Sequence, residues 1–148
     1  MGLLNKLFGK KKSLKSDILA ASDWIVTALQ SSGYNADYSL ESMKEIDRFF
    51  DEQNTPSGIL AQNRGGILFA LGSYVGQTAI KLYGGEWDAD DNAPNAEINI
   101  KVCLADGSII YPVVRCMNRY QLGAEESIYA YLALLSTKND KPCIQQFD

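Results

Sequence analysis

An alternation of apolar and polar residues over 97–104, closed by an Asp-Gly pair, constrains the fold more than any other feature. The apolar members of the alternation are Ile98, Ile100, Val102 and Leu104. This pattern predicts a strand with one buried face and one polar face. Asp106-Gly107 favours a tight turn, so we expect an antiparallel return strand from Ser108 to about Met117.

Pro112 lies within this return segment and cannot donate a ladder hydrogen bond, so we expect it at a sheet edge or a bulge. Glu86-Trp87 is a candidate for a third strand. Two strands alone are unstable in water, and another element must therefore cover the apolar face.

Four helices are predicted around this hairpin. Apolar stripes indicate helices over about 16–32, 39–52, 66–82 and 125–135, with residue 59 as an earlier alternative start for the third. The third helix is the most apolar, and we expect it to cover the hairpin. Its interior contains Gly72 and Gly76, where glycine costs about 1 kcal/mol relative to alanine. We therefore expect another element to pack closely against its backbone.

Helices set apart from an antiparallel sheet define the α+β class. The expected architecture has N-terminal helices, a central apolar helix packed on a small antiparallel hairpin or sheet, and a C-terminal helix. The chain of 148 residues has the usual length of one domain. We predict a basic, apolar and disordered leader at 1–13, a single domain at 14–137 and an irregular tail at 138–148.

The charge is unevenly distributed. The chain has a net charge of −4, and residues 1–15 hold five lysines and no acid, which leaves −9 for the remainder. An acidic body disfavours nucleic acid as a ligand and favours a basic protein partner. Apolar residues precede the lysines in the leader, the reverse of a secretory signal, so a cytoplasmic location is expected. Contact of residues 1–12 with a membrane surface is expected to be weak or absent.

The chain contains no histidine, which excludes Ser–His and Cys–His nucleophilic pairs and mixed Cys/His zinc sites. Its three cysteines, Cys103, Cys116 and Cys143, do not have the spacing of metal ligands. We therefore predict no catalytic residue, no metal and no cofactor.

An acidic segment with a tryptophan is the best candidate for binding. Its members are Glu86, Trp87, Asp88, Asp90 and Asp91. The segment opens like a calcium-binding loop, but Ala93 and Asn99 stand where that loop needs glycine and glutamate. Crowded carboxylates speed encounter with a cationic partner, and tryptophan is a frequent interface anchor. The alternative is that Trp87 packs inward on the third helix while the acids are solvated.

Four short motifs occur in the order seen in a known class of proteins. They are Tyr74-x-Gly76, Gly84-Gly85-x-Trp87, Asp106-Gly107 followed by Pro112, and Glu126-Ser127-Ile128. On these motifs, over about residues 66–135, the chain resembles a class of small bacterial α+β domains of unknown function. The resemblance implies the fold and a bacterial origin, and it implies no catalytic residue. By analogy of size and charge, some such domains accompany toxin genes as immunity proteins.

Three functions are compatible with the sequence. The favoured hypothesis is a non-enzymatic protein-binding module, immunity-like or regulatory, whose basic partner contacts the loop around Trp87. The alternatives are a small enzyme that uses carboxylates of this loop, and a peripheral protein held weakly on a membrane by residues 1–12.

Overall fold

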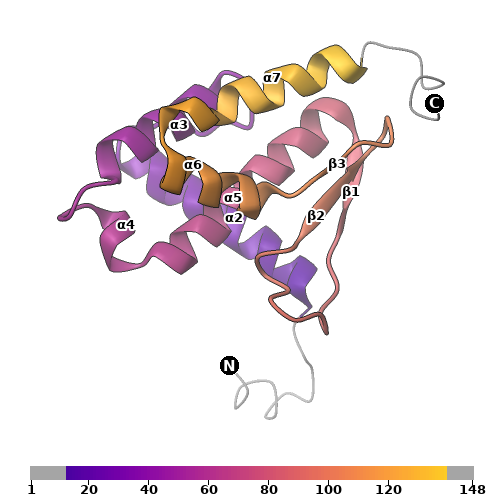
Figure 1. Cartoon of the computed structure of the whole chain (residues 1–148), viewed down its shortest axis with the longest axis horizontal. Coiled ribbons are helices and arrows are strands. Elements are labelled where there is room, and N and C mark those ends of the chain that lie inside the picture. The colour runs from indigo at the N-terminus through magenta and orange to yellow at the C-terminus, as the bar shows by residue number, and fades with distance from the viewer. Residues whose placement is uncertain (1–12, 140–148) are drawn as a thin grey trace.

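The structure, a computed structural model, describes residues 13–139 (Figure 1). The predictions made for residues 1–12, for Cys143 and for the tail from 140 onward lie outside the described residues. In chain order the elements are α2 (Leu14–Ser31), α3 (Ser42–Gln53), α4 (Ile59–Gln62), α5 (Arg64–Tyr83), β1 (Gly85–Asp88), β2 (Lys101–Leu104), β3 (Ile109–Ile110), α6 (Pro112–Leu122), the 3₁₀ turn η1 (Ala124–Glu126) and α7 (Ile128–Asn139).

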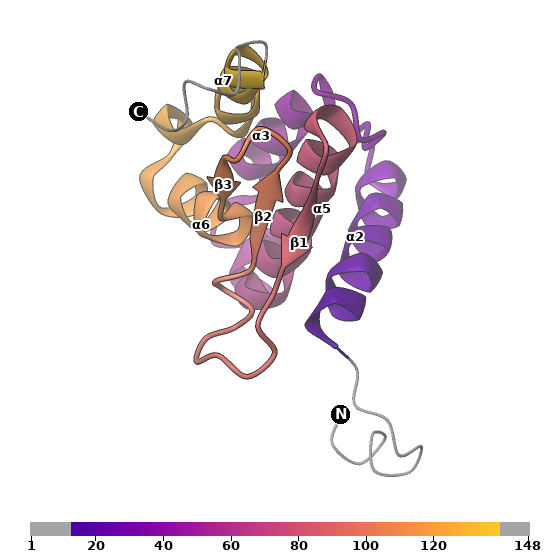
Figure 2. The same cartoon turned by 90° about the vertical axis from the view of Figure 1, so that its right-hand side faces the viewer.

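Helix α5 is the central element, and the other elements are arranged around it (Figures 1 and 2). It packs most extensively against α2 and α6, and it also contacts β1 and β2 of the sheet. Figure 2 shows the sheet in front of α5, with α2 on one flank and α6 on the other. This position explains why α5 has the most apolar sequence, because a helix that is surrounded by protein buries most of its circumference.

The three strands form an antiparallel sheet in the order β1-β2-β3. Trp87 pairs with Val102, which pairs in turn with Ile110, and all three side chains are buried toward the helices. Leu104 N donates to Ser108 O at 2.8 Å across the turn, where Gly107 has a φ of 91°. The tight turn at Asp106-Gly107, the third strand, the cover by α5 and the α+β class are thus confirmed.

Close approach to the glycines of α5 is also confirmed. A Cβ atom on Gly76 would overlap the Trp87 ring of β1. A Cβ atom on Gly72 would lie 2.5 Å from Val113 Cγ2 and 2.8 Å from Val113 Cα, so α6 rests directly on the α5 backbone there. Each glycine therefore allows one neighbouring element to approach the backbone of α5. Trp87 of β1 packs on Gly76, and α6 packs on Gly72.

The predicted start of the central strand was wrong. Strand β2 begins at Lys101, and residues 95–99 form turns instead. Asn95 has a φ of 54°, and its carbonyl accepts hydrogen bonds from the backbone N–H groups of Ile98 and Asn99. These local bonds replace ladder pairing, and Ile98 is therefore 37% exposed instead of buried in the sheet.

The predicted return strand to Met117 was also wrong, because β3 ends at Ile110 and α6 follows. Pro112 occupies the first turn of α6, a position where the missing N–H is not needed, so it marks neither an edge nor a bulge. Val113 and Cys116 are buried one turn apart, which is a helical spacing that the β-branched Val113-Val114 pair obscured.

Asp47 of α3 joins three helices. Its carboxylate accepts hydrogen bonds from Arg119 Nε (3.0 Å), from Ser127 Oγ (2.8 Å), and from the backbone N–H groups of Ile128 (2.8 Å) and Tyr129 (3.1 Å). Asp47 thus caps the start of α7 from another helix. Arg119, which lies on α6, is only 4% exposed.

The guanidinium of Arg119 also donates to Asp51 at 2.7 Å. Burial alone would lower the pKa of Arg119, but the hydrogen bonds to Asp51 and Asp47 outweigh it and hold that pKa above its usual value. The cation therefore stays charged inside the fold, because two carboxylates compensate it.

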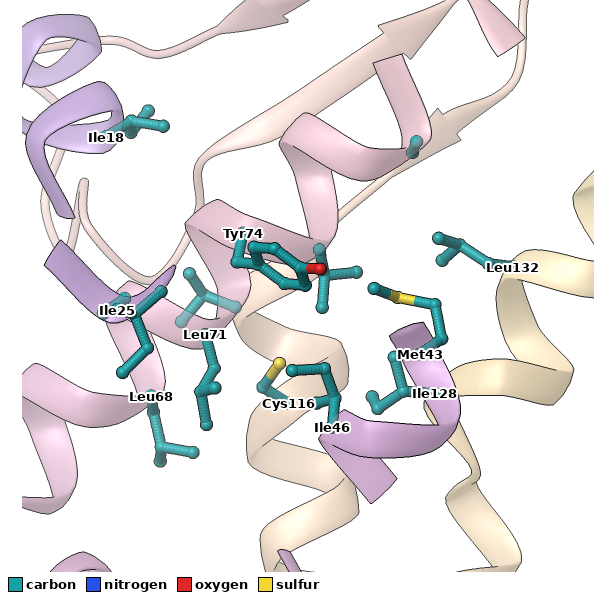
Figure 3. Close-up of a cluster of buried hydrophobic side chains, with 14 of the residues drawn as sticks. Ile18, Ile25, Met43, Ile46, Leu68, Leu71, Tyr74, Cys116, Ile128 and Leu132 are labelled. Carbon is teal, nitrogen blue, oxygen red and sulfur yellow. The ribbon is translucent and has the colours of Figure 1, made fainter. Parts of the chain in front are cut away.

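The hydrophobic core lies where α2, α3, α5, α6 and α7 meet (Figure 3). Residues of the apolar helical stripes face this core: Ile18 and Ile25 of α2, Met43 and Ile46 of α3, and Leu132 of α7 are all buried. Tyr74 of α5 is fully buried in the same region. Its hydroxyl accepts from Tyr38 N at 3.0 Å and lies 2.7 Å from Ser42 Oγ, and so ties the α2–α3 connection to the core.

Helix boundaries differ from expectation at α2, at α5 and at α7. Ser13 caps α2 through its hydroxyl, which accepts from Ser16 N at 3.1 Å, so the helix begins before Ser16. The third predicted helix divides at Asn63 into α4 and α5. Ser127 accepts from Ala130 N at 3.1 Å, so the last helix begins after it and runs to Asn139, past its expected end.

Candidate functional site

The acidic segment predicted to bind a partner does not form one site, because its side chains point in different directions. Glu86 and Asp88 of β1 lie on the outer, exposed face of the sheet. The carboxylate of Asp88 is 3.7 Å from the ammonium of Lys101, which belongs to the neighbouring strand. Two of the five predicted residues therefore contribute to a solvated sheet surface.

Trp87 faces the opposite way and is 8% exposed. Its ring packs on Gly76, and its Nε1 donates to Gln77 Oε1 at 2.8 Å. The alternative in which this tryptophan packs inward on the central helix is thus confirmed. An edge of the residue still lines a shallow hollow of about 300 Å³, together with Glu86, Lys15 and Leu19.

The two remaining acids stabilise local backbone. Asp90 Oδ1 accepts from Asn92 N at 3.0 Å within its own turn. Asp91 Oδ1 accepts from Leu14 N at 2.9 Å, and so joins the β1–β2 connection to the start of α2. A partner that contacts all five predicted residues at once would have to reach both faces of β1. The role of this segment in binding stays a prediction.

A larger hollow lies beside the predicted segment, at the first turns of α5. It is a groove of about 620 Å³, within the range of roughly 300–1,000 Å³ that is usual for ligand sites. Its wall is mostly apolar and consists of Leu68, Phe69, Ile98, Val113 and Met117. These residues come from α5, the β1–β2 connection and α6. We refer to this hollow as the apolar groove.

Three features of the sequence create the apolar groove. Gly72 lets α6 lie against α5, which brings Val113 and Met117 beside Leu68 and Phe69. The turns at residues 95–99 keep Ile98 out of the sheet and place it at the edge of the groove. Glycines at positions 65 and 66 leave the beginning of α5 without bulky side chains.

The rim of the apolar groove is charged. Asp17 of α2 and Glu97 of the β1–β2 connection lie on it, and both are exposed. Arg64 also lies there, but its guanidinium donates to Tyr120 Oη at 3.4 Å. Within residues 13–139, neither Asp17 nor Glu97 forms an ion pair.

A second, polar hollow of about 320 Å³ adjoins the groove. It shares Asp17 and Glu97 with the groove and adds Asp91 and Leu14. We refer to it as the acidic hollow. Together the two hollows present an apolar surface next to a concentration of carboxylates, an arrangement suited to a ligand that combines apolar and cationic groups.

Sequence reasoning missed the apolar groove, because its residues come from four separate segments. The available signals were Gly72, which indicated close packing, and Ile98, which was assigned to the sheet. Asp91 is the one predicted residue that lines the paired hollows. Within the described residues, no three Cys, Asp or Glu side chains gather closely enough to hold a metal ion.

Comparison with known proteins gave no match to a family model, a curated protein or a solved structure. None of the helices within residues 13–139 has the length and the apolar run that crossing a bilayer requires.

Proposed function

We propose that this protein is a non-enzymatic binding module, whose apolar groove and acidic hollow receive a short segment of a partner in which apolar residues adjoin lysine or arginine. The observation that carries the proposal is the juxtaposition of an apolar wall, formed by α5 and α6, with the carboxylates of Asp17, Glu97 and Asp91. The proposal keeps the basic partner that the net charge suggested, and moves its contact from Trp87 to the groove.

The two parts of the surface supply different contributions. Burial of one large apolar side chain contributes about 1.5–3 kcal/mol before the cost of ordering the ligand is subtracted. The carboxylates contribute little to affinity at an exposed rim, but they attract cations, fix orientation and speed association at low salt. A partner with both features is favoured over one that is only apolar or only basic.

A regulatory or immunity-like role in the cytoplasm of a bacterium is part of the same proposal. The resemblance in motif order suggests it, and a binding surface in place of a catalytic constellation fits it. Glu86 and Asp91 line different hollows, which argues against an enzyme that uses the carboxylates of this loop together.

A displayed library of random short peptides, selected on the purified protein, tests the proposal. We expect the enriched peptides to place an apolar residue within a few positions of lysine or arginine. Substitution of Ile98, which is partly exposed at the groove, by arginine should weaken those peptides at least tenfold. The matched control is Leu134→Arg, which places the same side chain on the exposed face of α7, away from the groove.

Binding of the selected peptides should also weaken between 50 and 500 mM salt, since exposed charge pairs are screened. Enrichment of acidic peptides would contradict the proposal. Equal binding of the enriched peptides to the wild type and the Ile98→Arg variant would contradict it as well. Circular dichroism of both variants checks that the fold is retained.

A further inference from the structure

We propose that the apolar groove has a ligand within the same chain: the leader, residues 1–12, binds across the acidic hollow and the groove and competes there with an outside partner. This inference rests on the proposed function, because it concerns the same surface. It is compatible with a leader outside the folded core, since the contact is with a surface groove and is reversible.

The position of the leader favours this contact. The described chain starts at Ser13, and Leu14 and Asp17, its near neighbours, line the acidic hollow. In both views the start of α2, the β1–β2 connection and the first turns of α5 lie on the same side of the molecule (Figures 1 and 2). The leader is therefore attached at the border of the site that it is proposed to occupy.

The leader is also long enough to reach the groove. An extended chain spans at most about 3.3–3.6 Å per residue. Phe8 stands five positions before Ser13, which gives it a range of roughly 17 Å from that attachment point. Asp17, one helical turn into α2, already lines the apolar groove. The apolar residues of the leader are therefore within reach of the groove without any change in the described fold.

The order of basic and apolar residues in the leader matches the order of the two hollows. Counted back from Ser13, the leader first presents lysines and then apolar residues. The lysines nearest to Ser13 are Lys10, Lys11 and Lys12, and the apolar residues before them are Leu3, Leu4, Leu7 and Phe8. Counted outward from Leu14, the surface first presents the acidic hollow and then the apolar groove. The two orders match, so one docking direction satisfies both the charge and the apolar surface.

Attachment in the same chain makes even a weak contact effective. A short tether gives a ligand an effective concentration of about 1 mM. If the leader binds its groove with a dissociation constant of about 0.1 mM, it lowers the apparent affinity of an outside ligand about tenfold. Removal of the leader from the groove should therefore expose a binding surface that is mostly covered in the intact protein.

A fluorescent synthetic peptide of residues 1–12 is the probe, and its anisotropy is measured with the full chain. In the leader variant, Leu7→Asp with Phe8→Asp, the tethered segment loses its apolar contacts and leaves the groove open. The probe should bind this variant five- to tenfold more tightly than the wild type. Addition of Ile98→Arg to the leader variant should abolish binding, and addition of Leu134→Arg should not change it.

Equal binding of the probe to the wild type and the leader variant would overturn the inference, as would binding that Ile98→Arg does not affect. Binding of the probe to anionic vesicles but to no form of the protein would show that the leader contacts lipid instead. The peptides selected from the library separate the two proposals. If they bind the leader variant through the groove while the probe does not, this inference fails and the proposed function stands. If Ile98→Arg affects neither, both fail.

Discussion

Replacement of Gly72 by alanine tests the close contact between α5 and α6. The new Cβ would lie 2.5 Å from Val113 Cγ2, 2.8 Å from Val113 Cα and 2.9 Å from Val113 N, whereas ordinary contacts begin near 3.4 Å. A different rotamer of Val113 relieves the first contact only. The two backbone contacts require α6 to move away by about half an ångström.

The magnitude follows from two opposing effects. Overpacking of a core contact costs about 1–3 kcal/mol, and a contact with backbone belongs in the upper part of that range. In a helix interior, alanine is more favourable than glycine by about 1 kcal/mol, which offsets part of this cost. We therefore expect Gly72→Ala to lower the free energy of unfolding by about 1–2 kcal/mol.

Urea unfolding followed by far-UV circular dichroism provides the measurement, and Gly65→Ala is its matched control in the same helix. A Cβ atom at position 65 meets nothing within 4 Å, so this variant should be unchanged or more stable by up to about 1 kcal/mol. In the Gly72→Ala background, Val113→Ala should recover only part of the loss, because the backbone contacts remain. If Gly72→Ala proves as stable as Gly65→Ala, the packing argument is incorrect.

Three further predictions concern buried groups. Asp47→Ala should lower the free energy of unfolding by about 3 kcal/mol in urea, since it removes the cap of α7 and one partner of buried Arg119; a loss below 1 kcal/mol would contradict this. In a Trp24→Phe variant the fluorescence of Trp87, 8% exposed, should resist quenching by acrylamide until the protein unfolds. Burial raises the pKa of the Cys116 thiol, so mass spectrometry should find it unmodified by iodoacetamide at pH 8 in the folded protein and alkylated in urea.

The parts of the fold that the sequence predicts well depend on local signals. Asp106-Gly107 specifies a tight turn through its own backbone preferences, and the apolar members of 100–104 identify the buried face of β2. Gly72 and Gly76 indicate close approach because glycine is costly in a helix interior unless packing compensates. The pattern does not say which element approaches, and α6 at Gly72 was not anticipated.

The features that were mispredicted depend on competition between local and distant interactions. Val113-Val114 has β-branched residues typical of a strand, but burial of Val113 against α5 and of Cys116 in the core favours a helix, for which Pro112 is a suitable start. Ile98 fits the alternating pattern, yet the turn closed by Asn95 removes it from the sheet. Val113 and Ile98 both line the apolar groove, so the groove could not be predicted from a sequence reading that placed these residues in strands.

The capping of α7 by Asp47 has a consequence for the order in which the chain folds. The donors at the start of α7 lie 80 to 82 positions after Asp47, and Arg119 lies 72 positions after it. During synthesis α3 therefore leaves the ribosome long before its partners exist, and its carboxylate lacks the full set of donors until residue 129 has emerged. Contacts of such long sequence separation slow folding, because the loop between them must close first. We expect α7 to join late, as the step that completes cooperative folding.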